Sequence, residues 1–190
     1  MAHLASTPDA NDLLERDPLA LLLGMLLDQQ IPMEKAFTSP RVLADRMGVD
    51  RLDAAAIAAY DPAEMIEIFR TPPALHRFPV AMAERTQAMC QALVERYDGT
   101  AASVWTDAPS GAEIVRRMST LPGFGAQKAK IFTALLGKQF GVRPPGWESA
   151  AGDYGLDGYR SIADVVDDAS RLKVRDTKKQ VKAAARAVPS

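Results

Sequence analysis

Leu121-Pro122-Gly123-Phe124-Gly125-Ala126-Gln127-Lys128-Ala129-Lys130 joins two stretches of helical character, and this join decides the fold. Upstream, Ser110 is followed three residues later by Glu113, a pairing typical of a helix start. Downstream, apolar residues recur at helical spacing from Ala129 to Leu136. The sequence therefore predicts two helices that meet at a short hairpin containing glycine, together covering residues 112–138.

The two glycines of this hairpin favour the binding of an anion. Gly123 and Gly125 have no Cβ, so the chain can turn sharply and a ligand can approach its backbone. The free N–H groups and the positive dipole end of the second helix would face that ligand. An ordinary helix corner, the alternative, would need only one glycine. The second glycine, with Lys128 and Lys130 behind it, indicates a nucleic-acid phosphate.

Three segments, in matching order and spacing, resemble the helix-hairpin-helix (HhH-GPD) DNA glycosylases, the superfamily of endonuclease III, adenine glycosylase and alkyladenine glycosylase. They are the hairpin, residues 22–30 (Leu-Leu-Gly-Met-Leu-Leu-Asp-Gln-Gln) and residues 81–99, which resemble the helix before the hairpin in endonuclease III. The resemblance covers roughly residues 17–160. It implies one all-α domain over residues 1–190, a helical bundle with a base pocket between two halves. These halves are residues 1–30 plus 145–190, and residues 31–144.

Composition also favours an all-α protein. A chain of 190 residues with 47% hydrophobic residues can fill a real core, and the aromatic share of only 6%, with abundant Ala, favours helices over sheets. Patterning and start signals predict helices over residues 17–27, 39–47, 50–60, 61–69, 81–97, 110–118, 126–138, 147–151, 161–167 and 170–187.

Residue counts exclude several kinds of site. One Cys rules out a disulfide framework and the four-thiolate iron–sulfur cluster of endonuclease III and adenine glycosylase, and two His leave no evident zinc site. We expect no cofactor beyond a monovalent cation that the resemblance implies at the hairpin carbonyls. The longest apolar block, residues 19–27, is too short to span a bilayer, and the N-terminus lacks a signal-peptide pattern. We expect a monomeric cytoplasmic protein, associated with the nucleoid, that binds double-stranded DNA.

Basic charge is concentrated in the C-terminal tail. Residues 171–190 hold seven Lys and Arg residues and one acidic residue, although the net charge of the chain is −1. Arg175, Lys179, Lys182 and Arg186 are spaced to share one helix face. We interpret this face as a track for DNA phosphates, with a solvated terminal helix as the alternative.

Enzymes that act on a base extract it from the stack, and a side chain must fill the gap. The resemblance implies that Gln30 enters the duplex, and it aligns Phe78 with an apolar wedge on the opposite loop. The alternatives are a helix cap for Gln30 and a core anchor for Phe78. At the hairpin, the predicted DNA contacts are Leu121, Gly123, Phe124, Gly125, Gln127, Lys128 and Lys130.

The sequence departs from the family at the catalytic lysine. Members that also cut the strand use a hairpin Lys that forms a Schiff base with the sugar. Gln127 occupies that position, and an amide cannot perform this chemistry. Lys128 follows one residue later, about 100° around the helix, and is expected to point elsewhere. A lyase mechanism is therefore disfavoured, unless the turn is shifted by one residue.

The resemblance also implies a carboxylate that stabilises positive charge on the sugar. The pair Phe140-Gly141 places Glu148 at this position, and a longer loop would offer Asp153 instead. A solvated surface carboxylate is the alternative for both. Trp147 and Tyr154 are candidates to stack on an extruded base, or else fill the core.

These features favour a monofunctional DNA glycosylase that hydrolyses the N-glycosidic bond of a damaged base, with Glu148 ranked before Asp153 as the catalytic carboxylate. The retained Gln30 and the full-length bundle support the enzyme. The near-neutral net charge and the missing hairpin Lys favour the alternative, a DNA-binding module without catalysis. A hairpin used for protein contacts is a third alternative.

Overall fold

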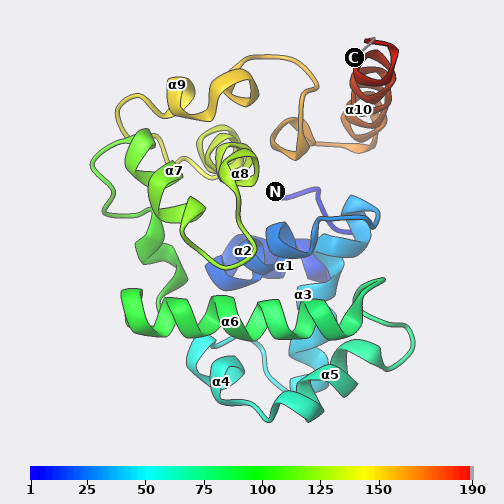
Figure 1. Cartoon of the computed structure of the whole chain (residues 1–190), viewed down its shortest axis with the longest axis vertical. Coiled ribbons are helices and arrows are strands. Elements are labelled where there is room, and N and C mark those ends of the chain that lie inside the picture. The colour runs from blue at the N-terminus through cyan, green and yellow to red at the C-terminus, as the bar shows by residue number, and fades with distance from the viewer. Residues whose placement is uncertain (189–190) are drawn as a thin grey trace.

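The computed structural model describes residues 1–188, and within that range it is helical and contains no β-strand (Figure 1). The all-α prediction is therefore confirmed. The α-helices are α1 (Pro8–Arg16), α2 (Pro18–Leu27), α3 (Met33–Met47), α4 (Ala54–Ala59), α5 (Pro62–Arg70), α6 (Pro79–Tyr97), α7 (Gly111–Ser119), α8 (Ala126–Gln139), α9 (Trp147–Ala151) and α10 (Asp168–Ala187). The 3₁₀ turns are η1 (Ala101–Val104), η2 (Gly152–Gly155) and η3 (Ile162–Asp164).

Several helices begin where the sequence supplies a capping side chain. Asp17 accepts two backbone N–H bonds at the start of α2, immediately before Pro18. Ser110 accepts the N–H of Glu113 at the start of α7, and Asp167 forms a capping box at the start of α10. These local signals explain why α2, α7 and α10 begin close to their predicted positions.

The helices of the structure differ from the predicted ones at several points, of which the shorter α4 (Ala54–Ala59, predicted over residues 50–60) is the simplest. The helix predicted to begin at Ser39 begins at Met33, so Pro40 lies inside α3. Residues 161–167, predicted as a helix, form only the short turn η3, because Val165 is extended and Asp167 is the extended N-cap of α10. Helix α1 was not predicted, because its burial depends on tertiary contacts such as those of Asn11, which accepts backbone N–H groups from the N-terminal segment.

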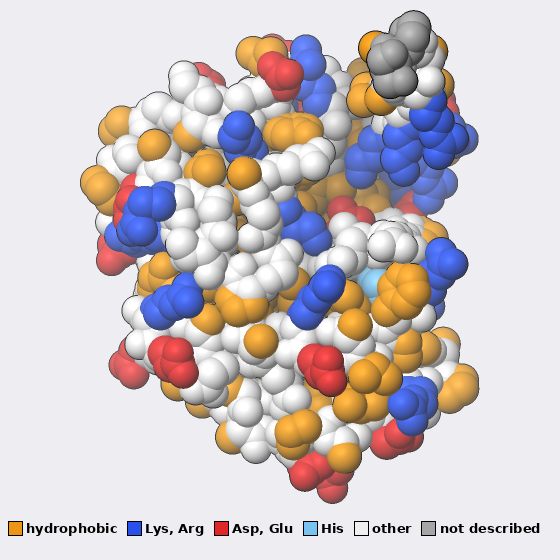
Figure 2. Space-filling model, viewed as in Figure 1, with side chains coloured by type: hydrophobic (Ala, Val, Ile, Leu, Met, Phe, Trp, Pro, Cys, Tyr) orange, Lys and Arg blue, Asp and Glu red, His pale blue; other side chains and the backbone are white. Residues whose placement is uncertain are grey.

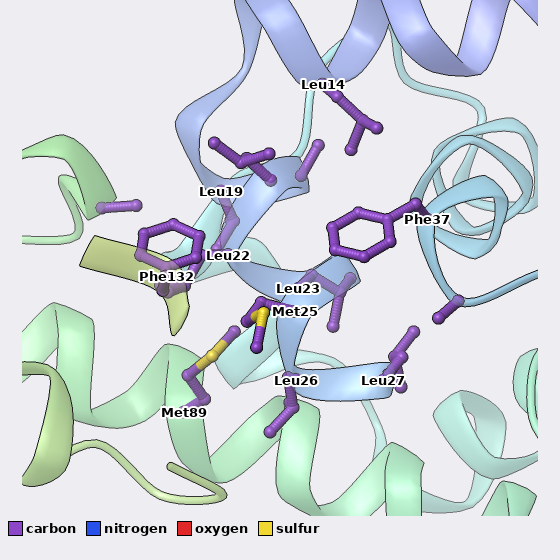
Figure 3. Close-up of a cluster of buried hydrophobic side chains, with 14 of the residues drawn as sticks. Leu14, Leu19, Leu22, Leu23, Met25, Leu26, Leu27, Phe37, Met89 and Phe132 are labelled. Carbon is purple, nitrogen blue, oxygen red and sulfur yellow. The ribbon is translucent and has the colours of Figure 1, made fainter. Parts of the chain in front are cut away.

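Helix α2 is the centre of the hydrophobic core. Its residues 19–27 are all buried, as expected of a helix that is apolar on every side. Figure 3 shows Phe37 of α3, Met89 of α6 and Phe132 of α8 arranged around it. The approach to α3 is close: a Cβ at Gly24 would lie 2.4 Å from a ring carbon of Phe37.

The remaining helices surround this core in two groups. Helices α4, α5 and α6 form one end of the molecule, α7, α8 and α9 form the other, and α1 to α3 lie between them (Figure 1). Helix α10 projects from the second end and contacts the rest of the fold mainly through its first turns. Within residues 1–188, no helix has both the length and the apolar character needed to cross a membrane.

Candidate functional site

The hairpin between α7 and α8 is anchored by its apolar residues. The side chains of Leu121 and Phe124 are buried in the core, so a contact of either residue with DNA would have to come from its backbone. Gly123 has a φ of +86°, and a Cβ there would lie 2.1 Å from Cδ1 of Leu26. Both its conformation and its packing therefore require glycine.

Gly125 differs from Gly123 in conformation and packing, although both are exposed. It is exposed, its φ of −101° is open to any residue, and a Cβ there would meet no atom within 4 Å. Gly125 is the N-cap of α8, and no side chain caps this helix end. The first-turn N–H groups of α8 therefore face open surface, where they can bind an anion.

A cavity of about 680 Å³ lies beside this end of α8. Figure 2 shows a hollow next to α10, whose Lys and Arg side chains form a large basic cluster. Five segments line the cavity: the end of α2, the start of α8, residues 151–154, the segment before η3 and one face of α10. The lining residues are Met25, Asp28, Gln127, Lys128, Lys130, Ile131, Ala151, Gly152, Asp153, Tyr154, Arg160, Ser161, Thr177, Lys178, Val181 and Lys182. Five Lys and Arg side chains against two Asp make it a basic site.

Lys128 and Gln127 both line this cavity, contrary to the expectation that Lys128 points elsewhere. The cavity extends around most of the first turn of α8, so a rotation of about 100° does not take a side chain out of it. The side-chain amide of Gln127 donates to the hydroxyl of Tyr154 over 2.9 Å. The Nζ of Lys128 donates to the carbonyl oxygen of Leu26 over 3.0 Å.

Lys128 has an unusual environment for a lysine. Its stem is partly buried, and burial lowers the pKa of its amine to about 8, although the nearby Asp28 carboxylate opposes this shift. Burial also raises the pKa of Asp28, against the effects of Lys178 and Lys128. An amine and a carboxyl group whose pKa values are both moved toward neutrality thus meet at one wall of the cavity.

The structure separates the two candidate carboxylates. Asp153 is exposed and lines the cavity, whereas Glu148 is exposed but is not part of the cavity lining. The two candidate aromatic residues separate in the same way. Tyr154 lines the cavity, but Trp147 packs against α7 and α8, since a Cβ at Gly137 would lie 2.2 Å from its ring. Of the two carboxylates predicted from the sequence, only Asp153 therefore lies at the cavity.

Gln30 and Phe78 lie on two loops that His76 joins. The buried His76 ring uses Nε2 to bind the carbonyl oxygens of Leu27 and Gln29, at 3.1 Å and 2.9 Å. Its Nδ1 accepts the backbone N–H of Phe78 over 3.0 Å. Phe78 is 40% exposed and Gln30 is exposed with a left-handed φ of +57°. Phe78 is therefore not a core anchor, and Gln30 is not a regular helix cap.

The cations of α10 have three kinds of surroundings. Arg175 forms an ion pair with Glu34 of α3, and Lys182 and Lys178 line the cavity. Lys179 is exposed and lies outside the cavity lining. The face toward the cavity is therefore displaced from the face predicted from the sequence, which comprised Arg175, Lys179, Lys182 and Arg186.

Asp28 and His76 were not selected from the sequence. Asp28 did carry a signal, because an acidic residue at the C-terminal end of a helix opposes the helix dipole. A residue that breaks a local rule in this way marks a candidate functional position. His76 carried no comparable signal, since its partners are 47 and 49 residues away in the chain.

Among residues 1–188, no cluster of three or more His, Cys, Asp or Glu side chains is arranged to hold a metal ion. Comparisons of the chain with protein-family models, with curated proteins and with solved structures found no match.

Proposed function

We propose that this protein is a DNA glycosylase of the helix-hairpin-helix type, which binds double-stranded DNA and removes a damaged base in base excision repair. The observation that carries the proposal is the basic cavity of about 680 Å³ directly beside the open N-terminus of α8. Its volume falls within the range of ligand pockets and exceeds what one nucleobase requires. A phosphate bound at α8 would bring the neighbouring nucleotide to this cavity.

Two features support a bound duplex. Gly125 leaves the N-terminal N–H groups of α8 accessible, although neither its φ nor its packing requires glycine. Gln30 and Phe78 are exposed on neighbouring loops, as side chains that enter a duplex must be. In this proposal the bundle has two halves, residues 1–30 with 145–190 and residues 31–144, and a monovalent cation binds the hairpin carbonyls.

Asp153 takes the role of the carboxylate that stabilises positive charge on the sugar. It lines the cavity from the turn after α9, beside Tyr154, whose ring is placed to contact an extruded base. Since Glu148 lies outside the cavity lining, it provides a matched control.

The test is incubation with duplexes that each carry one modified base, followed by alkali to cut at abasic sites. We expect cleavage at one or more modified bases. Asp153→Asn should lower the rate by about 10²-fold with duplex binding nearly intact, because the carboxylate acts on charge that develops in the transition state. Glu148→Gln should retain the parent rate.

A DNA-binding module without catalysis is the second candidate, favoured by the amide of Gln127 at the family's lysine position. Duplex binding with no product from any modified base would support it. Absence of duplex binding would contradict both candidates.

A further inference from the structure

One imidazole ring connects the two loops that carry the exposed side chains of Gln30 and Phe78. The Nε2 atom of His76 lies 2.9 Å from the carbonyl oxygen of Gln29, and its Nδ1 atom lies 3.0 Å from the backbone nitrogen of Phe78. The first bond holds the peptide group that joins Gln29 to Gln30, and the second holds the peptide group that leads into Phe78. His76 therefore fixes the backbone immediately before each exposed side chain.

These two peptide groups depend on the His76 ring. Within residues 1–188, the carbonyl oxygen of Gln29 and the N–H of Phe78 have no other hydrogen-bond partner. Only 1% of His76 is exposed, so water does not substitute for the ring at either group. The link between the loops thus needs one side chain that donates at one end and accepts at the other.

The residue before Gln30 is held on several sides, whereas Gln30 itself is not. The side chain of Gln29 accepts from the guanidinium of Arg85 over 2.9 Å and donates to the carbonyl oxygen of Leu26 over 2.8 Å. Gln30 has a left-handed φ of +57°, which is unfavourable for a residue other than glycine, and its side chain makes no hydrogen bond within residues 1–188. The fold thus maintains an unfavourable backbone conformation that presents a polar side chain to solvent, as expected of a side chain that binds a partner.

The hydrogen bonds assign one form of the ring. Nε2 faces the carbonyl oxygens of Leu27 and Gln29 and must carry the hydrogen, whereas Nδ1 accepts an N–H and must lack one. Burial lowers the pKa of His76 and so favours the neutral ring, and the cations of Lys35 and Lys128 act in the same direction. Only the neutral ring with its hydrogen on Nε2 can hold both loops at once.

We propose that His76 is a positioning residue, which holds Gln30 and Phe78 in a fixed relative placement so that both side chains enter a duplex together. The inference rests on the proposed function, because a gap in the base stack opens only when a base is extruded. Two side chains that are already placed enter the gap without the loss of affinity that ordering two loops would cause. Loss of His76 should therefore weaken binding to a duplex that contains a gap, but not binding to an intact duplex.

The test uses the full chain and two duplexes that differ at one position, which carries either a normal nucleotide or a stable abasic analogue. Fluorescence anisotropy at one salt concentration measures both affinities, since phosphate contacts depend on salt. We expect the parent to prefer the abasic duplex, because the base that would have to be unstacked is already missing. The ratio of the two affinities is the preference that the variants are compared by.

Two variants of His76 separate its two bonds. His76→Gln places an amide nitrogen where Nε2 lies and no acceptor where Nδ1 lies, so it keeps the bond to Gln29 and releases Phe78. His76→Asn places an amide oxygen where Nδ1 lies but is too short to reach Gln29, so it keeps Phe78 and releases the other loop. Each variant should lower the preference by roughly three- to tenfold, the effect of one lost hydrogen bond, and leave affinity for the intact duplex unchanged.

Double-mutant cycles distinguish positioning from a general structural role. His76→Gln should have no further effect on the preference in a Phe78→Ala background, and His76→Asn should have none in a Gln30→Ala background. Ile57→Val is the control for lost stability, because Ile57 is fully buried in α4, outside the two loops, and it should keep the parent preference. Thermal unfolding verifies that each variant folds.

Nitrogen NMR of the parent tests the ring without relying on the folding of any His76 variant. The chain has two His residues, so comparison with His3→Gln assigns the signals of His76. We expect a neutral ring with its hydrogen on Nε2 near neutral pH. A charged ring, or a hydrogen on Nδ1, overturns the proposed link.

The binding results separate this inference from the proposed function. An unchanged preference in both His76 variants, or an equal loss of affinity for the two duplexes, overturns the role of His76 and leaves the proposed function standing. Additive effects in both cycles do the same. A parent that binds neither duplex overturns the proposed function itself.

Discussion

Helices α2 and α10 differ in how much of their surface is buried, and therefore in what holds them in the fold. Every residue from Leu19 to Leu27 is buried, and other helices pack around α2 on all sides. In α10 only Ser170 and Val174 are buried, and most of its twenty residues lie in solvent. Hydrophobic burial determines the position of α2, whereas α10 depends on its capping box and on ion pairs such as Arg175 with Glu34.

This difference assigns the two helices different roles at the site. Helix α2 presents its rigid C-terminal end, with Asp28, to the cavity, where a fixed geometry suits chemistry. Helix α10 presents Lys178 and Lys182 on long, exposed side chains, which suit contacts with a phosphate backbone. The comparison therefore predicts large losses of stability from changes in α2 and losses of DNA affinity from changes in α10.

The largest effect should come from the core. Leu22→Ala, in the centre of α2 and fully buried, should lower the free energy of unfolding by about 2–5 kcal/mol. Leu172→Ala, in α10 and 58% exposed, should change it by no more than about 0.5 kcal/mol. Urea unfolding of both variants measures the two values. Similar losses in the two helices would break the comparison.

The hairpin glycines should give the next largest difference. Gly123→Ala combines a φ of +86° with a contact to Leu26 and should cost about 1–3 kcal/mol of stability. Gly125→Val should cost no more than about 1 kcal/mol, the loss of a favourable N-cap residue, but should weaken binding to all duplexes alike, since phosphate contacts carry no sequence information. Unchanged affinity in the folded Gly125→Val protein would exclude the phosphate site.

His76 should make stability depend on pH. Burial lowers its pKa below the ordinary 6.5, so the folded protein binds a proton less readily than the unfolded chain. The stability that the neutral His76 ring contributes is therefore present above pH 6.5, and it is lost as the pH falls below that value. Thermal unfolding between pH 8 and pH 5 measures it, and His76→Gln should flatten the dependence. An equal pH dependence in parent and variant would contradict this role.

The smallest effect on stability should come from α10. The double variant Lys178→Ala/Lys182→Ala should change the unfolding free energy by less than about 0.5 kcal/mol, because both side chains are exposed. If both contact phosphates, the slope of log affinity against log salt should flatten by roughly 2. The matched control Lys179→Ala/Arg186→Ala, outside the cavity lining, should keep the parent slope. Equal slopes in all three proteins would show that Lys178 and Lys182 do not contact phosphates and that α10 is only a solvated terminal helix.

Much of the helical layout was predictable because its signals are local. The start of α2 at Asp17-Pro18, the start of α7 after Ser110 and the glycine turn at residues 121–125 all follow from side chains that act within a few residues. The failures have the opposite cause. Helix α1 packs on α2 and α3, and Ser39 inside α3 donates its hydroxyl to the carbonyl of Leu75, and no short stretch of sequence reveals such contacts.

For the candidate site, the sequence alone determined that a glycine hairpin opens a helix whose N–H groups can bind an anion, and that lysines follow it. Only the tertiary structure decided which side chains share the cavity. It brought Lys128 to Asp28 across 100 residues, included Asp153 and excluded Glu148. The physical reason is that capping and turns depend on neighbouring residues, whereas burial, and the pKa shifts it causes, depend on every segment packed around a group.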